Sequence, residues 1–141
     1  MSEKKLIEIK CRKIVGGKAN GKAVLTNQPL NMLSMIDAKS GEIKDENHEL
    51  FKRTLKNKIL IFPNSIGSSV GAYIFYSLKT NKVNPLGIVC LKKCDTITAS
   101  GCAISDIPLV DNLDLEIRPL IEEKTEIFLD ADNQKITIKK V

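Results

Sequence analysis

The sequence is poor in aromatic residues and in arginine. Among 141 residues there is no tryptophan, and only four phenylalanines and two tyrosines occur. The formal net charge of +5 therefore comes almost entirely from lysines, which are scattered along the chain. Nucleic-acid-binding surfaces usually use arginine forks and aromatic platforms. We therefore expect no nucleic-acid partner, and we interpret the lysines as a solvated surface that could attract a small anionic substrate or an acidic partner.

Long apolar runs are also missing. No stretch approaches the about 18 apolar residues of a membrane-spanning helix, and no basic and then apolar leader occupies residues 1–14. We therefore expect a cytoplasmic protein with no membrane contact. The length and the hydrophobic content of 43% suffice for one core. We predict a single domain over residues 1–141.

The four cysteines do not form a recognisable metal or disulfide pattern. Cys90, Cys94 and Cys102 follow a Cys-x3-Cys-x7-Cys spacing, which matches none of the usual zinc or iron–sulfur spacings. Together with Cys11 they are better explained as reduced thiols, and Cys90 as a core residue. We expect no disulfide and no metal bound by this chain, and we assign these cysteines no role.

A single histidine limits the catalytic options. His48 lies in a polar segment between Asn47 and Glu49, where it could act as a base or a metal ligand, or simply pack in the loop. No G-x-S-x-G elbow is present to supply a nucleophile for a triad. We therefore do not expect a Ser-His-Asp hydrolase.

Strand patterns dominate both ends of the chain. In residues 6–15, Ile7, Ile9 and Cys11 alternate with polar residues, as in a half-buried strand. Further strands are predicted at residues 22–26, 115–117, 125–129 and 135–138, with turns at Gly16-Gly17, Asn20-Gly21 and 131–134. Residues 28–35, which contain Pro29, are predicted to be loop.

The middle of the chain has a different pattern. An apolar strand at residues 58–62 is followed by Pro63, a small polar loop, a helical pattern at 70–79 and a buried strand at 86–91. This order predicts a right-handed βαβ crossover. Residues 96–107 fit either a second candidate active-site loop or a short helix and turn. The predicted fold is mixed α/β, mostly strands with a central strand-loop-helix unit.

The loop Gly67-Ser68-Ser69 is the strongest candidate site. Unpaired N–H groups at a helix start stabilise an anion or a developing negative charge. Ser68 and Ser69 place two hydroxyls there. The loop can equally be an ordinary helix start capped by one of these serines. From the residues alone both interpretations remain open.

Several separated segments resemble the small subunit of the aconitase X group. They are residues 62–73, 95–97 and 101–111, with further agreement at 17–25 and 41–50. In archaea this kind of subunit belongs to phosphomevalonate dehydratase. The resemblance implies a swivelling β/β/α domain, like the mobile domain 4 of aconitases, that closes over a large subunit to form a heterodimer.

The resemblance also implies an activity and a set of site residues. Ser68 matches the proton acceptor of the family, and Gly67 and Ser69 would shape the loop and bind substrate. The implied reaction dehydrates (R)-5-phosphomevalonate to trans-anhydromevalonate 5-phosphate, in a modified mevalonate route to isoprenoids. A [4Fe-4S] cluster is expected on the large subunit and no cofactor on this chain.

Two differences from aconitases affect the expected substrate. Val70 and Gly71 stand where aconitases proper have an arginine that grips a substrate carboxylate, and Asn64-Ser65 replaces a more basic, glycine-containing pair. Citrate and isopropylmalate are therefore poorer substrate candidates. An aconitase X-type dehydratase of another hydroxyacid or of hydroxyproline is an alternative. A non-catalytic anion-binding module is a second alternative.

Overall fold

The computed structural model describes residues 5–140, which form one large sheet, one small sheet and three α-helices. The helices are α1 (Met32–Met35), α2 (Gly71–Thr80) and α3 (Thr96–Ser105), with a 3-10 turn η1 (Arg118–Leu120). The strands are β1 (Lys5–Lys10), β2 (Arg12–Val15), β3 (Lys18–Leu25), β4 (Leu30–Asn31), β5 (Lys58–Phe62), β6 (Ser65–Ile66), β7 (Gly87–Cys90), β8 (Leu109–Asp111), β9 (Glu126–Asp130) and β10 (Lys135–Lys140).

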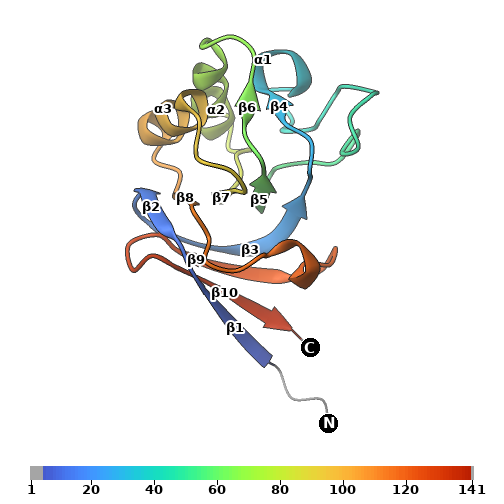
Figure 1. The fold of residues 1–141 in the computed structure, drawn as a ribbon. Helices are drawn as coiled ribbons and strands as arrows, with labels where there is room; N and C mark the ends of the chain where they lie inside the picture. Colours follow the sequence, from blue (N-terminus) through green and yellow to red (C-terminus); the bar gives the residue numbers. More distant parts are fainter. Residues whose placement is uncertain (1–4, 141) are drawn as a thin grey trace.

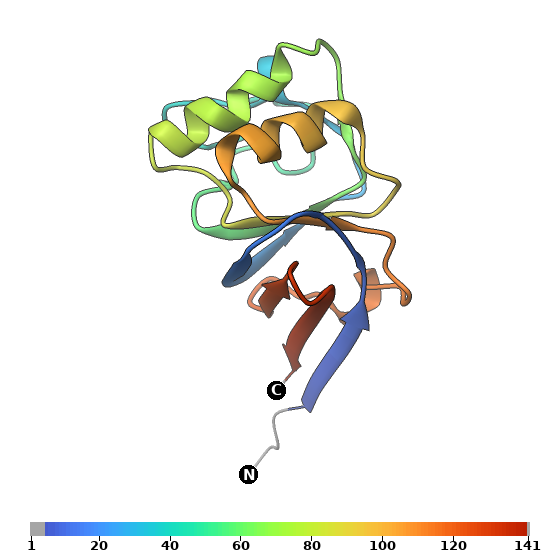
Figure 2. The ribbon, with the colours of Figure 1, turned by 90° about the vertical axis from the view of Figure 1, so that its left-hand side faces the viewer.

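The large sheet curls back on itself. Its eight strands run in the order β1-β10-β9-β3-β5-β7-β8-β2. The strands at its two ends, β1 and β2, are consecutive in the chain and are separated only by Cys11. The two ends of the sheet are therefore close together, as Figures 1 and 2 show. The alternation predicted for residues 6–15 is confirmed, because Ile9 is fully buried between exposed neighbours.

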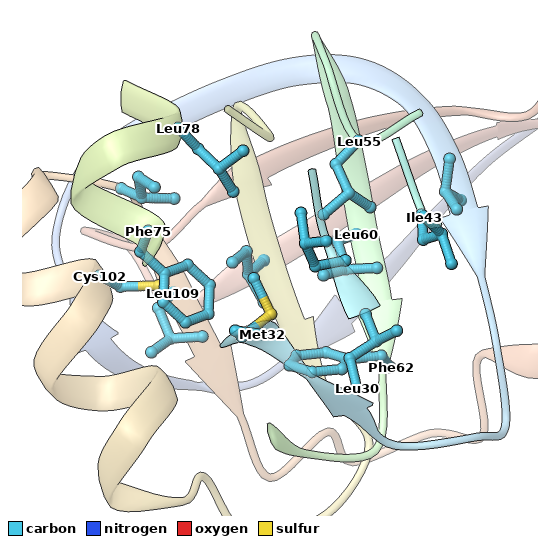
Figure 3. Packing of buried hydrophobic residues seen from close by; sticks show 14 of the residues in the cluster. Leu30, Met32, Ile43, Leu55, Leu60, Phe62, Phe75, Leu78, Cys102 and Leu109 are labelled. Carbon is cyan, nitrogen blue, oxygen red and sulfur yellow. The ribbon is translucent and has the colours of Figure 1, made fainter. Parts of the chain in front are cut away.

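Two hydrophobic clusters divide the molecule into three layers. The first fills the space between the two halves of the curled sheet and includes Ile59, Ile61, Val89, Ile127, Leu129, Ile136 and Ile138. The second lies between the sheet and the helices and includes Leu60, Phe62, Phe75, Leu78, Cys102 and Leu109 (Figure 3). Consecutive residues of β5 alternate between the two clusters, since side chains along a strand point to opposite faces. The layers are sheet, sheet and helices.

The central strands are parallel. β5 pairs with β7, and β7 pairs with β8, both in parallel. The helix α2 connects β5 to β7. The predicted βαβ unit is therefore confirmed, with its two strands parallel. The helix α3 connects the second pair. Residues 96–105, for which a loop or a short helix was predicted, form this ten-residue helix.

Three local predictions are wrong. Asn20-Gly21, predicted as a turn, lies inside β3, where Gly21 faces β9 and passes close to the Asn57 carbonyl. Residues 115–117 form no strand, because the Glu116 carboxylate bonds to the Arg118 amide and guanidinium and leads the chain into η1. Residues 28–35 contain β4 and α1 rather than loop alone.

The loops that lead from β5 into α2 and from β7 into α3 lie at one edge of the sheet. In parallel strands the carboxyl ends meet at the same edge, so α2 and α3 both start there. Figure 2 shows both helix starts on the right-hand side. Within residues 5–140, no helix combines the length and the apolar character needed to cross a bilayer.

Close packing of α2 against α3 depends on Gly101, and this can be tested. A Cβ at this position would overlap the Phe75 ring and lie 3.0 Å from the Ala72 carbonyl oxygen. We expect Gly101→Ala to lower the free energy of unfolding by about 1–3 kcal/mol, because the helices would have to separate. Urea unfolding measures this, with the exposed Ala103→Ser as a control. Equal stability of the two variants would contradict the close packing.

A second test concerns Asp111, which ties β8 to β2. Its fully buried carboxylate accepts hydrogen bonds from Arg12 Nε at 2.8 Å, from Arg12 Nη2 at 2.7 Å and from the Cys94 amide at 2.8 Å. Burial alone would raise the pKa of Asp111, but these hydrogen bonds outweigh it and leave the pKa below its ordinary value. The hydrogen bonds to Asp111 are therefore stronger when its carboxylate is charged.

Because the pKa of Asp111 is depressed on folding, its stabilisation is present above the unfolded pKa of about 4 and is lost as the pH falls through the folded value. We expect Asp111→Asn to be less stable than the wild type by about 2 kcal/mol near neutral pH, and the difference to shrink in acid. Denaturant unfolding across a pH series measures both values. A constant difference at all pH values would contradict the proposed pairing. The control is Glu46→Gln, at an exposed carboxylate away from this network.

Candidate functional site

The Gly67-Ser68-Ser69 loop projects from the edge where α2 starts. After Pro63 the chain forms β6, which pairs in parallel with β4, and then enters the loop. In Figure 1 β6 runs upward into this loop at the top of the molecule. All residues from 66 to 70 are exposed. The structure thus presents both serine hydroxyls at the surface.

Ser68 begins the turn that leads into α2. Its Oγ accepts a hydrogen bond from the Val70 amide at 3.1 Å, and its carbonyl accepts from the Gly71 amide at 2.9 Å. Neither the Ser68 nor the Ser69 amide has an acceptor among residues 5–140. Two N–H groups beside the Ser68 hydroxyl are therefore free for an anion or for a charge on that oxygen.

The predicted capping by either serine needs a correction. The N-cap of α2 is Val70, whose side chain can accept no hydrogen bond. Only Ser68 offers a side-chain acceptor to an amide of this turn, and the Ser69 hydroxyl has no partner in the described part of the chain. The interpretation of Ser69 as the helix cap is therefore wrong, and its hydroxyl is free to face a ligand.

Two features require a glycine at position 67: a positive φ angle and the close side chain of Asn31. Its φ of +92° lies in the region that side chains rarely adopt. A Cβ there would overlap the side-chain NH₂ group of Asn31 and lie 2.7 Å from its Cγ. Asn31 is itself the N-cap of α1, and its Oδ1 accepts from the Ser34 amide at 3.2 Å. Gly67 thus lets the loop turn directly against α1.

A buried polar network supports the other side of the loop. Asp95 Oδ1 accepts from the Ser65 amide at 2.9 Å, and the Ser65 and Thr98 hydroxyls are 2.7 Å apart. Ser65 is only 4% exposed, so its hydroxyl serves this network and is not available to a substrate. Asp95 and Thr98 were not among the predicted site residues. An Asp three residues before a Thr amide in a helical pattern is a recognisable N-cap signal.

Two of the four cysteines and the histidine are buried. Cys90 and Cys102 are fully buried in the core beneath the helices, and burial raises the pKa of the Cys102 thiol well above its ordinary value. His48 is buried too, and its Nδ1 accepts the Leu50 amide at 3.0 Å, which supports the loop-packing interpretation. Among residues 5–140, no group of three or more His, Cys, Asp or Glu side chains could hold a metal ion.

Exposed apolar side chains surround the loop. Four of them are between 41% and 63% exposed: Leu33 in α1, Ile66 in β6, Val70 at the N-cap of α2 and Tyr73 in α2. A cleft of about 490 Å³ is found elsewhere, lined by Arg12, Lys93, Asp111 and neighbours, and it includes none of residues 67–70. The serines therefore stand on an exposed, partly apolar surface outside this cleft.

The fold and the loop identify the class of protein. A family model described as the aconitase X swivel domain matches residues 8–138, so the chain belongs to this family. This confirms the resemblance and the predicted mixed, mostly stranded swivel fold.

Individual relatives are more specific. The protein of Thermococcus kodakarensis named phosphomevalonate dehydratase small subunit is 36% identical over 132 residues, covering 94% of this chain and 96% of that protein. A protein of the same name from Methanococcoides burtonii is 38% identical over 130 residues, covering 92% and 89%. These names imply a larger partner subunit.

Solved structures agree with this assignment. A crystal structure of the holo-form of Thermococcus kodakaraensis aconitase X has a TM-score of 0.86 at 36% identity, covering 94% of this chain and 98% of that chain. A solution NMR structure of a UPF0107 protein has a TM-score of 0.83 at 32% identity, covering 92% and 97%.

The geometry of Gly67 can be tested by adding one methyl group. We expect Gly67→Ala to lower the free energy of unfolding by about 2 kcal/mol, because the left-handed backbone and the contact with Asn31 both oppose a Cβ. Thermal or urea unfolding measures the loss. Ser69→Ala, on the exposed side of the loop, should leave stability unchanged. A Gly67→Ala variant as stable as Ser69→Ala would show that the loop does not hold this conformation.

Proposed function

We propose that this chain is the small subunit of a two-subunit hydro-lyase that dehydrates (R)-5-phosphomevalonate to trans-anhydromevalonate 5-phosphate in an archaeal-type mevalonate route. The observation that carries the proposal is the exposed Ser68 hydroxyl beside free amides at the start of α2. The relatives named phosphomevalonate dehydratase small subunit support the substrate. The chain acts in the cytoplasm and only together with its large subunit.

Ser68 is the proposed proton acceptor. A proton next to a carboxylate is weakly acidic, so its removal needs a strong base, and a serine alkoxide is strong enough. An alkoxide is rare at neutral pH unless its charge is stabilised. The Val70 amide already donates to Ser68 Oγ at 3.1 Å, and the positive end of the α2 dipole lies at the same place. These groups favour the charged form of Ser68 without a histidine.

Gly67 and Ser69 are the proposed substrate-binding residues. Gly67 allows the sharp turn that brings the backbone close to a ligand, and the free Ser69 amide and hydroxyl can donate hydrogen bonds to an anionic group. Both lie next to Ser68 on the exposed loop. The substrate would therefore be held on this side mainly by backbone and hydroxyl donors.

The large subunit completes the site. A Lewis acid for the leaving hydroxyl would come from the [4Fe-4S] cluster that we expect on that subunit, since no described group of this chain fits a cluster. Ser68 is exposed, so a partner has to cover it to exclude water. The exposed side chains of Leu33, Ile66, Val70 and Tyr73 surround the loop and form an apolar contact surface for that partner.

Two other functions make different predictions. A dehydratase of another hydroxyacid or of hydroxyproline would keep the Ser68 chemistry but would not require a phosphate on its substrate. A non-catalytic anion-binding module would tolerate loss of both serine hydroxyls. Substrate screening of the reconstituted complex distinguishes the first, and the serine variants distinguish the second.

The role of Ser68 is tested in the complex of both subunits. We expect Ser68→Ala to lower kcat for phosphomevalonate dehydration about 10²–10⁴-fold with little change in KM, because a general base acts in the transition state. Ser69→Ala should mainly raise KM. The matched control is Ser77→Ala in the last turns of the same helix, which should behave as wild type. Near-normal turnover by Ser68→Ala would rule out the assigned base.

A further inference from the structure

We infer that Asp95 is a positioning residue that holds the Ser68 loop in its reactive geometry; this inference rests on the function proposed above. Asp95 itself is the N-cap of α3 and does not belong to the loop. It acts on Ser68 through Ser65, three residues earlier in the chain. Asn31, the N-cap of α1, holds the loop from the other side. We call Asp95 and Asn31 together the cap clamp.

Asp95 uses both carboxylate oxygens. Oδ1 accepts from the Ser65 amide at 2.9 Å and from Thr98 Oγ1 at 2.8 Å, and Oδ2 accepts from the Thr98 amide at 2.9 Å. One bond caps the helix, as the N-cap of any helix does. The bond to the Ser65 amide is different, because it leaves the helix and joins a strand 30 positions away in sequence.

The two partners of this half-buried carboxylate are themselves buried. Thr98 is fully buried, Ser65 is 4% exposed, and their hydroxyls are 2.7 Å apart. Ser65 and Thr98 thus find their hydrogen-bond partners in each other and in Asp95, and little water can reach the two buried residues. A hydrogen bond removed here leaves a buried polar group unsatisfied, so the arrangement is held tightly.

Asn31 completes the clamp at Gly67. β4 pairs with β6 through Leu30 opposite Ser65 and Asn31 opposite Ile66. The side chain of Asn31 lies so close to Gly67 that a Cβ there would be 2.7 Å from Cγ. Residues 65–67 are therefore fixed on both sides, whereas residues 68–70 project into solvent.

The consequence concerns the reaction rather than folding alone. A base that is displaced by about 1 Å can lose about 10²-fold in rate, because proton transfer depends on the distance between the reacting atoms. Ser68 follows Gly67 directly, so a shift at Ser65 moves its hydroxyl. If Asp95 were only a helix cap, its loss would lower stability and leave the rate of the folded enzyme unchanged.

The test compares two aspartates with similar local roles. Asp95→Asn replaces one accepting oxygen by an NH₂ group, and we expect kcat of the two-subunit enzyme to fall about 10–100-fold with KM within about threefold. The control is Asp130→Asn. Asp130 is 4% exposed and accepts from the Asn133 amide and side chain at a turn between β9 and β10. It should lose stability but keep kcat.

Two variants of Thr98 keep the test informative if Asp95→Asn fails to fold. Thr98→Val removes only the hydroxyl between Asp95 and Ser65 and should lower kcat in the same direction, whereas Thr98→Ser keeps the hydroxyl and should restore it. If Asp95→Asn and Thr98→Val lower the melting temperature but leave kcat unchanged, Asp95 is a helix cap and the inference is wrong.

Amide hydrogen exchange separates this inference from the proposed function. In the complex, we expect exchange in residues 63–70 to rise at least about tenfold in Asp95→Ala, which removes both accepting oxygens, and to stay unchanged in Asp130→Ala, because only the first releases the Ser65 amide. Unchanged exchange would refute the clamp whatever the reaction is. A fully active Ser68→Ala enzyme would instead refute the proposed base, and the exchange result would still stand.

Discussion

The structure depends on burying both faces of its central parallel strands. Along β5, Ile59 and Ile61 point into the cluster inside the curled sheet, and Leu60 and Phe62 point toward the helices. A strand that is apolar on both faces needs a layer on each side, so the sheet folds over one face and α2 and α3 cover the other. Parallel pairing then places both helix starts at one edge. The fold thus puts two sets of helix N-terminal groups where the site lies.

The proposed site is one half of an active site. Ser68 and Ser69 are exposed, next to free amides and apolar side chains, and they lie outside the cleft lined by Arg12 and Asp111. Such a surface suits a domain that closes over a larger partner. The base would be carried by this chain and the Lewis acid by the other, so neither subunit would carry out the dehydration alone.

Rigid support and exposure are combined in a few residues. The loop leaves the body of the protein between two N-cap side chains, Asn31 and Asp95, and then projects freely from Ser68 onward. Because Ser65 and Thr98 are buried, water does not compete easily for the hydrogen bond between them. A docking domain needs this combination, because its reactive group has to keep a defined position before the partner arrives.

The sequence by itself determined the elements that have a local signal. Alternation predicts β1, the apolar runs predict β5 and β7, and the serines and Gly67 together with the family resemblance point to the loop. Predictions failed where a distant contact decides. Gly21 lies in a strand because β9 pairs with it, and residues 115–117 make a turn because Glu116 bonds to Arg118. Only the tertiary structure brings Asp95 to Ser65 and Asn31 to Gly67, since these contacts join segments that are far apart in the chain and carry no common local pattern.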